Sequence, residues 1–327
     1  MPEGSEASDS GCVLALVEGL LAARLEGVNL STGAAPPERF FGSKIRPQAG
    51  LKTGRAYSET EPLVYSAACR KIRPQMPRFR ESRVSATANV DPYEIAKFEA
   101  LAERWWDPHG EFKPLHELNP LRLEFIRARL PLPGARIIDV GCGGGILSEA
   151  LAKAGADVIG IDLAETPLRV AELHALESNV AVRYRLESVE DHAAANAGHY
   201  DAVTCMELLE HVPRPDLMLG RLAELVRPGG QLFLSTLNRN LKSFLLAIVG
   251  AEYVLGLVPR GTHDYERFIR PSELARWARG AGLTLRAFTG ISFDPLTRQF
   301  RLSRDTGVNY LAHFVRPGAP ANPPAGA

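Results

Sequence analysis

The sequence predicts an α/β protein in which helices cover both faces of a doubly wound, mostly parallel β-sheet. Apolar runs with strand character alternate with helical segments between residues 136 and 314. The first of these runs passes into a glycine-rich turn, and the second ends in an acidic residue. A strand, a glycine turn and a helix in this order are typical of sheets that bind a nucleotide or a nucleoside.

The predicted elements begin near residue 91. Asp91 is a good N-cap for a helix that starts at Pro92, and Ile95, Phe98 and Leu101 recur at helical spacing. The tryptophan pair and the Asp-Pro step that follow, residues 105–108, are expected to end this helix.

A second helix is predicted after Asn119-Pro120, within a helical region that spans residues 91–130. Two turn signals then help to place strands: Arg227-Pro228-Gly229-Gly230 and Ala281-Gly282 each precede an apolar run. Together with the apolar patterns they predict strands at 136–140, 157–161, 181–185, 200–205, 231–236, 283–288 and 308–314.

The two ends of the chain differ from this ordered region. Residues 1–88 contain many Pro and Gly, and only Val13 to Val28 could form a short amphipathic helix. We expect a largely disordered extension here, and one hypothesis places the natural start at Val84, so that residues 1–83 are an overrun. Residues 89–316 then form the central domain, and the Pro- and Ala-rich tail 317–327 is expected to be disordered.

Composition argues against nucleic acid as a partner. Lys+Arg and Asp+Glu are balanced at 38 each, so the chain has no global field of either sign. The cysteines form no C-x-x-C pair, which predicts reduced thiols and neither disulfides nor a zinc cluster; they are Cys12, Cys69, Cys142 and Cys205.

The pattern of apolar residues predicts a cytoplasmic protein. No run reaches the roughly 20 apolar residues that a membrane-spanning helix needs. Glu3, Glu6 and Asp9 stand where a secretory signal would carry basic residues.

The turn after the first predicted strand reads Asp139-Val140-Gly141-Cys142-Gly143-Gly144-Gly145, and Asp162 ends the next strand. Glycines let a ligand approach bare backbone, and the acid can accept hydrogen bonds from both hydroxyls of a ribose. An isoleucine stands where a dinucleotide motif needs its third glycine, and no Lys-Ser/Thr pair follows to hold a triphosphate. The motif, with Asp139, Gly141 and Gly143, therefore predicts a site for the cationic nucleoside S-adenosylmethionine. A nicotinamide cofactor and a purely structural turn are the alternatives.

Acidic and basic side chains also follow the fourth predicted strand. If the chain turns helical there, Glu207, Glu210 and His211 stand at i, i+3 and i+4 and share one face. This pattern fits a solvated helix start, a general base at His211, or a site for a hard divalent ion. Glu190, after the third strand, is either an acceptor for an adenine amino group or a plain exposed acid.

An unusually apolar stretch, 244–258, lies within a segment around 239–270 that separates two predicted strands. It carries basic residues at its edges: Arg239, Lys242 and Arg260. The pattern fits an interfacial segment, a lid over an apolar substrate, or a pair of core helices. Trp105 and Trp106 are further candidates to close over an aromatic substrate.

Long motifs from Asn89 to about His313 resemble those of the ubiquinone biosynthesis O-methyltransferases. The matching stretches include Asn89-Val90-Asp91-Pro92, Arg104-Trp105-Trp106-Asp107, Asp139-Val140-Gly141-Cys142-Gly143-Gly144-Gly145, Leu209-Glu210-His211-Val212-Pro213, Gly261-Thr262-His263-Asp264 and Val308-Asn309-Tyr310. The resemblance implies a class I S-adenosylmethionine-dependent methyltransferase with a seven-stranded sheet whose last strand is antiparallel. It also implies two O-methylations of polyprenylated phenols on the way to ubiquinone.

The same resemblance assigns roles to individual residues. Cofactor contacts are expected at Gly141, Asp162, Met206 and Arg122, with Arg122 pairing with the methionine carboxylate. Related eukaryotic members imply Mg²⁺ at the Glu207, Glu210 and His211 positions. Peripheral contact with lipid at the inner membrane surface, or with other enzymes of ubiquinone biosynthesis, is a further expectation. A methyltransferase for another phenol or lipid and a non-catalytic scaffold that binds S-adenosylmethionine are the competing interpretations.

Overall fold

The structure is a computed structural model that describes residues 89–243, 265–294, 297 and 299–318. The expectations for the extension 1–88, for the apolar stretch 244–258 and for the tail beyond 318 lie outside the described residues.

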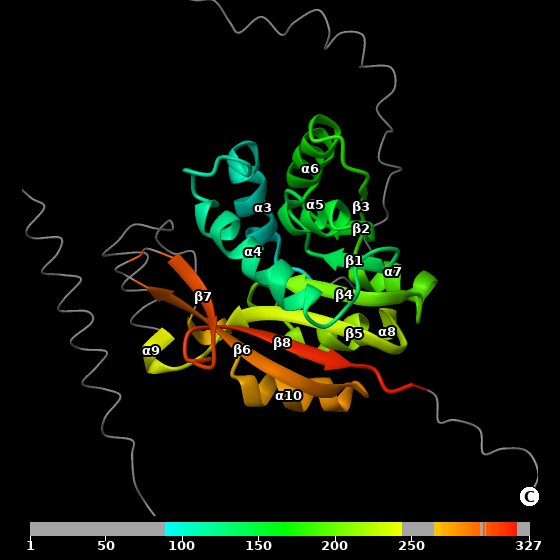
Figure 1. Cartoon of the computed structure of the whole chain (residues 1–327), viewed down its shortest axis with the longest axis vertical. Helices are drawn as coiled ribbons and strands as arrows, with labels where there is room; N and C mark the ends of the chain where they lie inside the picture. Colours follow the sequence, from blue (N-terminus) through cyan, green and yellow to red (C-terminus); the bar gives the residue numbers. More distant parts are fainter. Residues whose placement is uncertain (1–88, 244–264, 295–296, 298, 319–327) are drawn as a thin grey trace, which may run out of the picture. The chain divides into compact units, whose positions relative to one another are not determined.

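The described strands form one eight-stranded sheet in the order β3-β2-β1-β4-β5-β8-β6-β7 (Figure 1). Strands β1 to β5 pair in parallel, β8 lies antiparallel between β5 and β6, and β7 is antiparallel to β6. The bounds are β1 Arg136–Val140, β2 Asp157–Asp162, β3 Arg183–Leu186, β4 Tyr200–Met206, β5 Val226–Leu237, β6 Thr284–Asp294, β7 Gln299–Ser303 and β8 Asn309–Val315.

Helices connect most of these strands. Two helices and a 3₁₀ turn precede the sheet: α3 Pro92–Leu101, η1 Ala102–Arg104 and α4 Lys113–Arg127. The remaining helical segments are α5 Ile146–Lys153, α6 Glu165–Glu177, α7 Val189–Asn196, η2 Leu209–His211, α8 Pro215–Leu225, α9 Leu241–Ser243, η4 Tyr265–Arg267 and α10 Pro271–Gly280.

The first predicted helix is confirmed, and the start of the second was wrong. Asp91 caps α3 as expected, because its Oδ1 accepts the backbone N–H of Tyr93 at 3.1 Å. Helix α4 begins at Lys113, ahead of the predicted start, with Pro114 in its first turn and Pro120 inside it. A proline costs no hydrogen bond in the first turn, so Pro114 was an equally good start signal.

The predicted strands are all present, with shifted ends, and the expected number of seven was too low. Strand β7 is the additional one, a five-residue strand that pairs only with β6. The turn Arg227-Pro228-Gly229-Gly230 lies inside β5, where the pairing shifts from Tyr200↔Val226 to Ala202↔Gln231. Residues 227–230 therefore form an irregularity in a longer strand.

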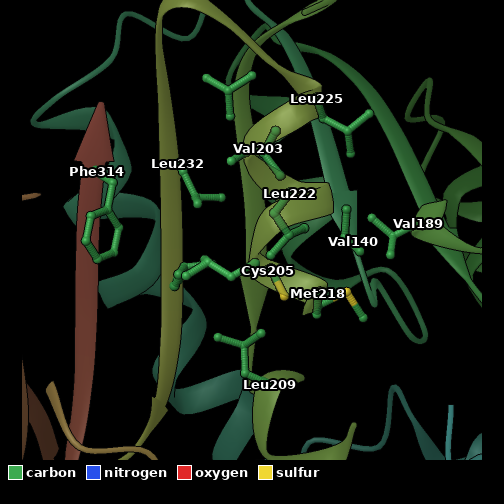
Figure 2. Packing of buried hydrophobic residues seen from close by; sticks show 14 of the residues in the cluster. Val140, Val189, Val203, Cys205, Leu209, Met218, Leu222, Leu225, Leu232 and Phe314 are labelled. Carbon is green, nitrogen blue, oxygen red and sulfur yellow. The ribbon is translucent and has the colours of Figure 1, made fainter. Parts of the chain in front are cut away.

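Alternation along the strands divides the core between the two faces of the sheet. Ile138 and Val203 point to one face, where α7, α8 and α10 pack, and Ile137 and Ala202 point to the other, where α4 and α5 pack. Figure 2 shows the first face, with side chains of α8 such as Leu222 packed against the strands. Figure 1 shows α4 and α5 on one side of the sheet and α10 on the other.

This topology brings the chemistry-bearing loops together. Strand β1 lies between β2 and β4, so the direction of chain progression reverses between β1 and β4. In doubly wound sheets, ligands bind at such a switch point, beyond the carboxyl ends of the strands. Among the described residues, none of the helices has the length and apolar character that crossing a bilayer would need.

Candidate functional site

The glycine-rich turn connects β1 to α5 at this edge of the sheet. Gly141, Gly143 and Gly145 have φ angles of 71°, 50° and 85°, which are favourable for glycine and strained for most other residues. The backbone N–H of Gly141 donates to the carbonyl of Ile161 at 2.9 Å. The turn therefore lies against the end of β2 and presents backbone without side chains.

Asp162, the last residue of β2, is joined to this turn. Its Oδ2 accepts the N–H of Gly143 at 2.8 Å, and its Oδ1 accepts the N–H of Ala164 at 2.9 Å. Burial raises the pKa of Asp162, while these backbone N–H groups act to lower it. The carboxylate thus stands beside the glycine turn, at the strand end where a ribose is held in nucleotide-binding sheets.

Two tryptophans pack directly on the glycine turn. A Cβ added to Gly143 or Gly144 would overlap the indole of Trp105, and Trp106 Nε1 donates to the carbonyl of Gly144 at 2.8 Å. The Trp106 ring also stacks on His174 with 4° between the planes. The structure therefore places this pair as a support of the turn.

Asp139 lies beneath the turn and is buried. Its Oδ2 accepts the hydroxyl of Ser148 at 2.6 Å and its Oδ1 accepts that of Thr204 at 2.7 Å. Burial raises the pKa of Asp139 to about 6, although both hydroxyl contacts act to lower it. These two contacts tie the turn to α5 and β4, and a direct contact of Asp139 with the cofactor stays a prediction.

Glu207 follows Met206, the last residue of β4, and has a φ of 54°. Positive φ is uncommon outside glycine and often marks a functional site. Its Oε1 accepts three donors: Ser235 Oγ at 2.6 Å, Arg122 Nη2 at 3.2 Å and Asn309 Nδ2 at 3.4 Å. Residues from α4, β4, β5 and β8 thus form a polar cluster beside the switch point.

Arg122 is 5% exposed and forms an ion pair with Glu207. Its Nε has no hydrogen-bond partner among the described residues. A buried donor without a partner is costly, so the atom favours an acceptor from outside the protein. This geometry fits the expected contact with an anionic group such as a carboxylate.

The helix that would place Glu207, Glu210 and His211 on one face does not form. Only a 3₁₀ turn, η2, forms there, because the positive φ of Glu207 ends the strand in a sharp turn. Glu210 is buried and accepts Thr236 Oγ1 at 2.8 Å, and burial raises its pKa to about 7. His211 contacts Glu94 Oε2 through Nδ1 at 2.9 Å.

These divergent contacts do not fit the Mg²⁺ site implied by the family resemblance. Each of the three side chains is held by a different partner: Glu207 by Ser235, Glu210 by Thr236 and His211 by Glu94. Within the part of the chain that the structure describes, no group of three His, Cys, Asp or Glu residues is arranged to hold a metal.

Sequence reasoning missed residues of α3 that lie at the site. Glu94 contacts His211, and Glu99 accepts the backbone N–H of Thr166 in the first turn of α6. These contacts join residues that are 117 and 67 positions apart, so no local pattern could reveal them. Glu190 lies in the first turn of α7 and accepts the N–H of Asn89 at 3.4 Å.

Comparison with known proteins shows which family the chain belongs to. A family model described as a methyltransferase domain matches residues 115–287. The ubiquinone biosynthesis O-methyltransferase of Thiobacillus denitrificans is 61% identical over 224 residues, which cover 68% of this chain and 97% of that protein. The protein of the same name from Ralstonia nicotianae is 58% identical over 233 residues, covering 71% of this chain and 98% of that protein.

A solved structure shares the fold. The magnesium protoporphyrin IX methyltransferase of Synechocystis PCC 6803, with bound SAH, has a TM-score of 0.51 and 22% identity, and the match covers 69% of this chain and 98% of that one. The expected class I methyltransferase fold is confirmed, with eight strands. The chain is 61% and 58% identical in sequence to the two sequence relatives over nearly their whole length. It therefore belongs to the ubiquinone biosynthesis O-methyltransferase family.

Proposed function

We propose that residues 89–316 transfer the methyl group of S-adenosylmethionine to a phenolic oxygen of polyprenylated intermediates, at both O-methylation steps of ubiquinone biosynthesis. The observation that carries this proposal is the contact of Asp162 with the N–H of Gly143, which sets a carboxylate beside bare backbone at the switch point. The family relationship supports the reaction and the class of acceptor.

The described residues fit the methyl donor at four places. Asp162 accepts the ribose hydroxyls, and Gly141 and Gly143 give the turn the positive φ angles that hold its backbone beside this carboxylate. Arg122 offers its unpartnered Nε to the methionine carboxylate, and Met206 lies at the end of β4 beside the site. Asp139 supports the turn from below and, as an anion, favours the donor's positive charge.

His211 is proposed as the general base. When bound, S-adenosylmethionine supplies an electrophilic methyl on a sulfonium. A phenol has a pKa near 10, so a base that takes its proton makes the oxygen a better nucleophile at neutral pH. His211 accepts this proton as the O–C bond forms, and the electrons of the broken S–C bond stay on sulfur. No step is assigned to Mg²⁺, because each of the three candidate ligands is held by a separate hydrogen-bond partner.

The experiment is complementation of a strain that lacks both O-methylation steps, with chromatographic identification of the quinone intermediates. Restored ubiquinone supports the substrate assignment, whereas an accumulated hydroxylated intermediate contradicts it. Transfer of radiolabelled methyl to a catechol analogue then separates an enzyme from a scaffold that only binds the donor.

The base assignment has its own test. The His211→Asn variant is expected to lose turnover while its affinity for S-adenosylmethionine, measured by calorimetry, stays unchanged. Normal turnover in this variant would remove His211 from the mechanism without affecting the substrate assignment.

The acceptor also bears on location. A polyprenyl tail partitions into lipid because each buried CH₂ contributes about 0.8 kcal/mol. Peripheral contact of the chain with the inner membrane surface is therefore part of this proposal. Flotation with anionic vesicles tests it, and a protein that stays at the bottom of the gradient contradicts it.

A further inference from the structure

Helix α3 brings an acidic side chain onto the proposed base. Glu94 Oε2 lies 2.9 Å from His211 Nδ1, and the ring of Phe98 packs edge-on against the imidazole, with 5.3 Å between ring centroids. The hydrogen bond from His211 is the main cause that lowers the pKa of Glu94, so this carboxylate is charged at neutral pH.

This contact decides which ring nitrogen of His211 carries the proton. An ionised carboxylate can only accept a hydrogen bond, so Nδ1 must be the donor. In the neutral imidazole the lone pair is then on Nε2. A carboxylate that accepts from Nδ1 also stabilises the imidazolium that forms when Nε2 takes a proton, as the aspartate does in Ser-His-Asp triads.

We propose that Glu94 is a positioning residue for the reaction: it holds His211 in the Nδ1–H tautomer, with Nε2 directed to the acceptor hydroxyl, and supports the charge that develops on the ring. This inference rests on the proposed role of His211 as base. In this role Glu94 acts through His211 and makes no contact of its own with the acceptor or the methyl donor.

The same geometry makes the base depend on the docking of α3. None of the residues of α3 is fully buried, and polar contacts tie it to the rest of the domain. Asp91 pairs with Arg267 at 2.9 Å, and Glu99 accepts from Thr166. The catalytic pair is therefore complete only when this helix lies in place beside the strand ends.

The test replaces Glu94 by Gln, which keeps the size and one oxygen acceptor but removes the charge. Loss of a hydrogen bond to a charged group should reduce kcat by about 10- to 100-fold. The Kd for S-adenosylmethionine and the KM for a catechol acceptor should stay within about twofold, because Glu94 contacts neither ligand. A merely structural role would instead change these constants together with kcat.

Nitrogen-15 NMR of the His211 ring provides a direct readout. The full-length chain should show the Nδ1–H tautomer, and the Glu94→Gln variant should shift it toward Nε2–H. The matched control is Glu224→Gln, which removes an exposed ion pair with Arg221 on α8 and leaves the contact between Glu94 and His211 intact. This control should keep the wild-type tautomer.

A double-mutant cycle separates the role of Glu94 from that of His211. In a His211→Gln background, Glu94→Gln should cause no further loss of kcat, because it acts through the imidazole. If Glu94→Gln alone has wild-type kcat, or if the two losses add, the positioning role is wrong while the base assignment stands. If His211→Gln has wild-type turnover, the base assignment fails and the positioning role fails with it.

Discussion

Replacing Asp139 by Asn should change how the stability of this chain depends on pH. Asp139 is 3% exposed, and burial raises the pKa of its carboxyl to about 6 from an ordinary 3.8. The folded protein therefore holds this proton to higher pH than the unfolded chain does. Its contribution to stability is fully present below about pH 4 and is lost as the pH rises through about 6.

The size of the effect follows from the two pKa values. A difference of about two units corresponds to about 3 kcal/mol of unfolding free energy. Roughly half of this, about 1.5 kcal/mol, is lost between about pH 5 and about pH 8. The amide of the variant keeps the two hydroxyl neighbours, Ser148 and Thr204, but does not titrate.

The assay is urea unfolding of the ligand-free wild type and Asp139→Asn at about pH 5 and about pH 8. Between about pH 5 and about pH 8, the unfolding free energy of the variant should rise by roughly 1.5 kcal/mol relative to that of the wild type. This is equivalent to about 3–6 °C in Tm for a domain of this size. Taking the difference between the two proteins cancels other titrating groups such as Glu210. A difference that does not vary with pH would refute the reasoning.

Three further predictions concern the turn, the strand end and the core. Gly143→Ala should weaken binding of S-adenosylmethionine in calorimetry, because the added Cβ overlaps Trp105. Gly198→Ala is the control for backbone strain, since Gly198 has a φ of 66° and a Cβ there meets nothing within 4 Å. Equal affinities of the two variants for S-adenosylmethionine would contradict the steric argument. Asp162→Asn should weaken S-adenosylhomocysteine binding by about 10- to 100-fold, since the amide loses a charged acceptor for the ribose; an unchanged Kd would remove the ribose contact. Tyr310→Phe removes the hydroxyl that donates to the carbonyl of Ile269 at 2.9 Å. This variant should lower the unfolding free energy by about 1–3 kcal/mol in urea titrations. An unchanged unfolding free energy would mean that the carbonyl finds another donor.

The strands and the glycine turn were predictable because their signals are local. Helices cover both faces of the sheet, so β1, β2 and β4 are buried along most of their length and appear in the sequence as short continuous apolar runs. The turn at 141–145 needs positive φ at alternate positions, and only glycine adopts it without strain. These two features were enough to predict the fold class and the class of ligand.

Elements that depend on distant contacts were not predictable in the same way. Helical spacing would place Glu207 on the same helix face as Glu210 and His211. In the structure, its carboxylate instead accepts hydrogen bonds from Ser235, Arg122 and Asn309, which lie on other elements. Strand β7 is too short to stand out from its sequence, and its pairing with β6 defines it.

The division between the two kinds of information has a physical cause. Burial periodicity and backbone strain are properties of neighbouring residues, so the order of the residues is sufficient to reveal the sheet, the turn and the acid that follows β2. Hydrogen bonds between side chains depend on which elements pack together. The contact between Glu94 and His211 spans 117 positions and exists only because the folded chain lays α3 against the ends of the strands.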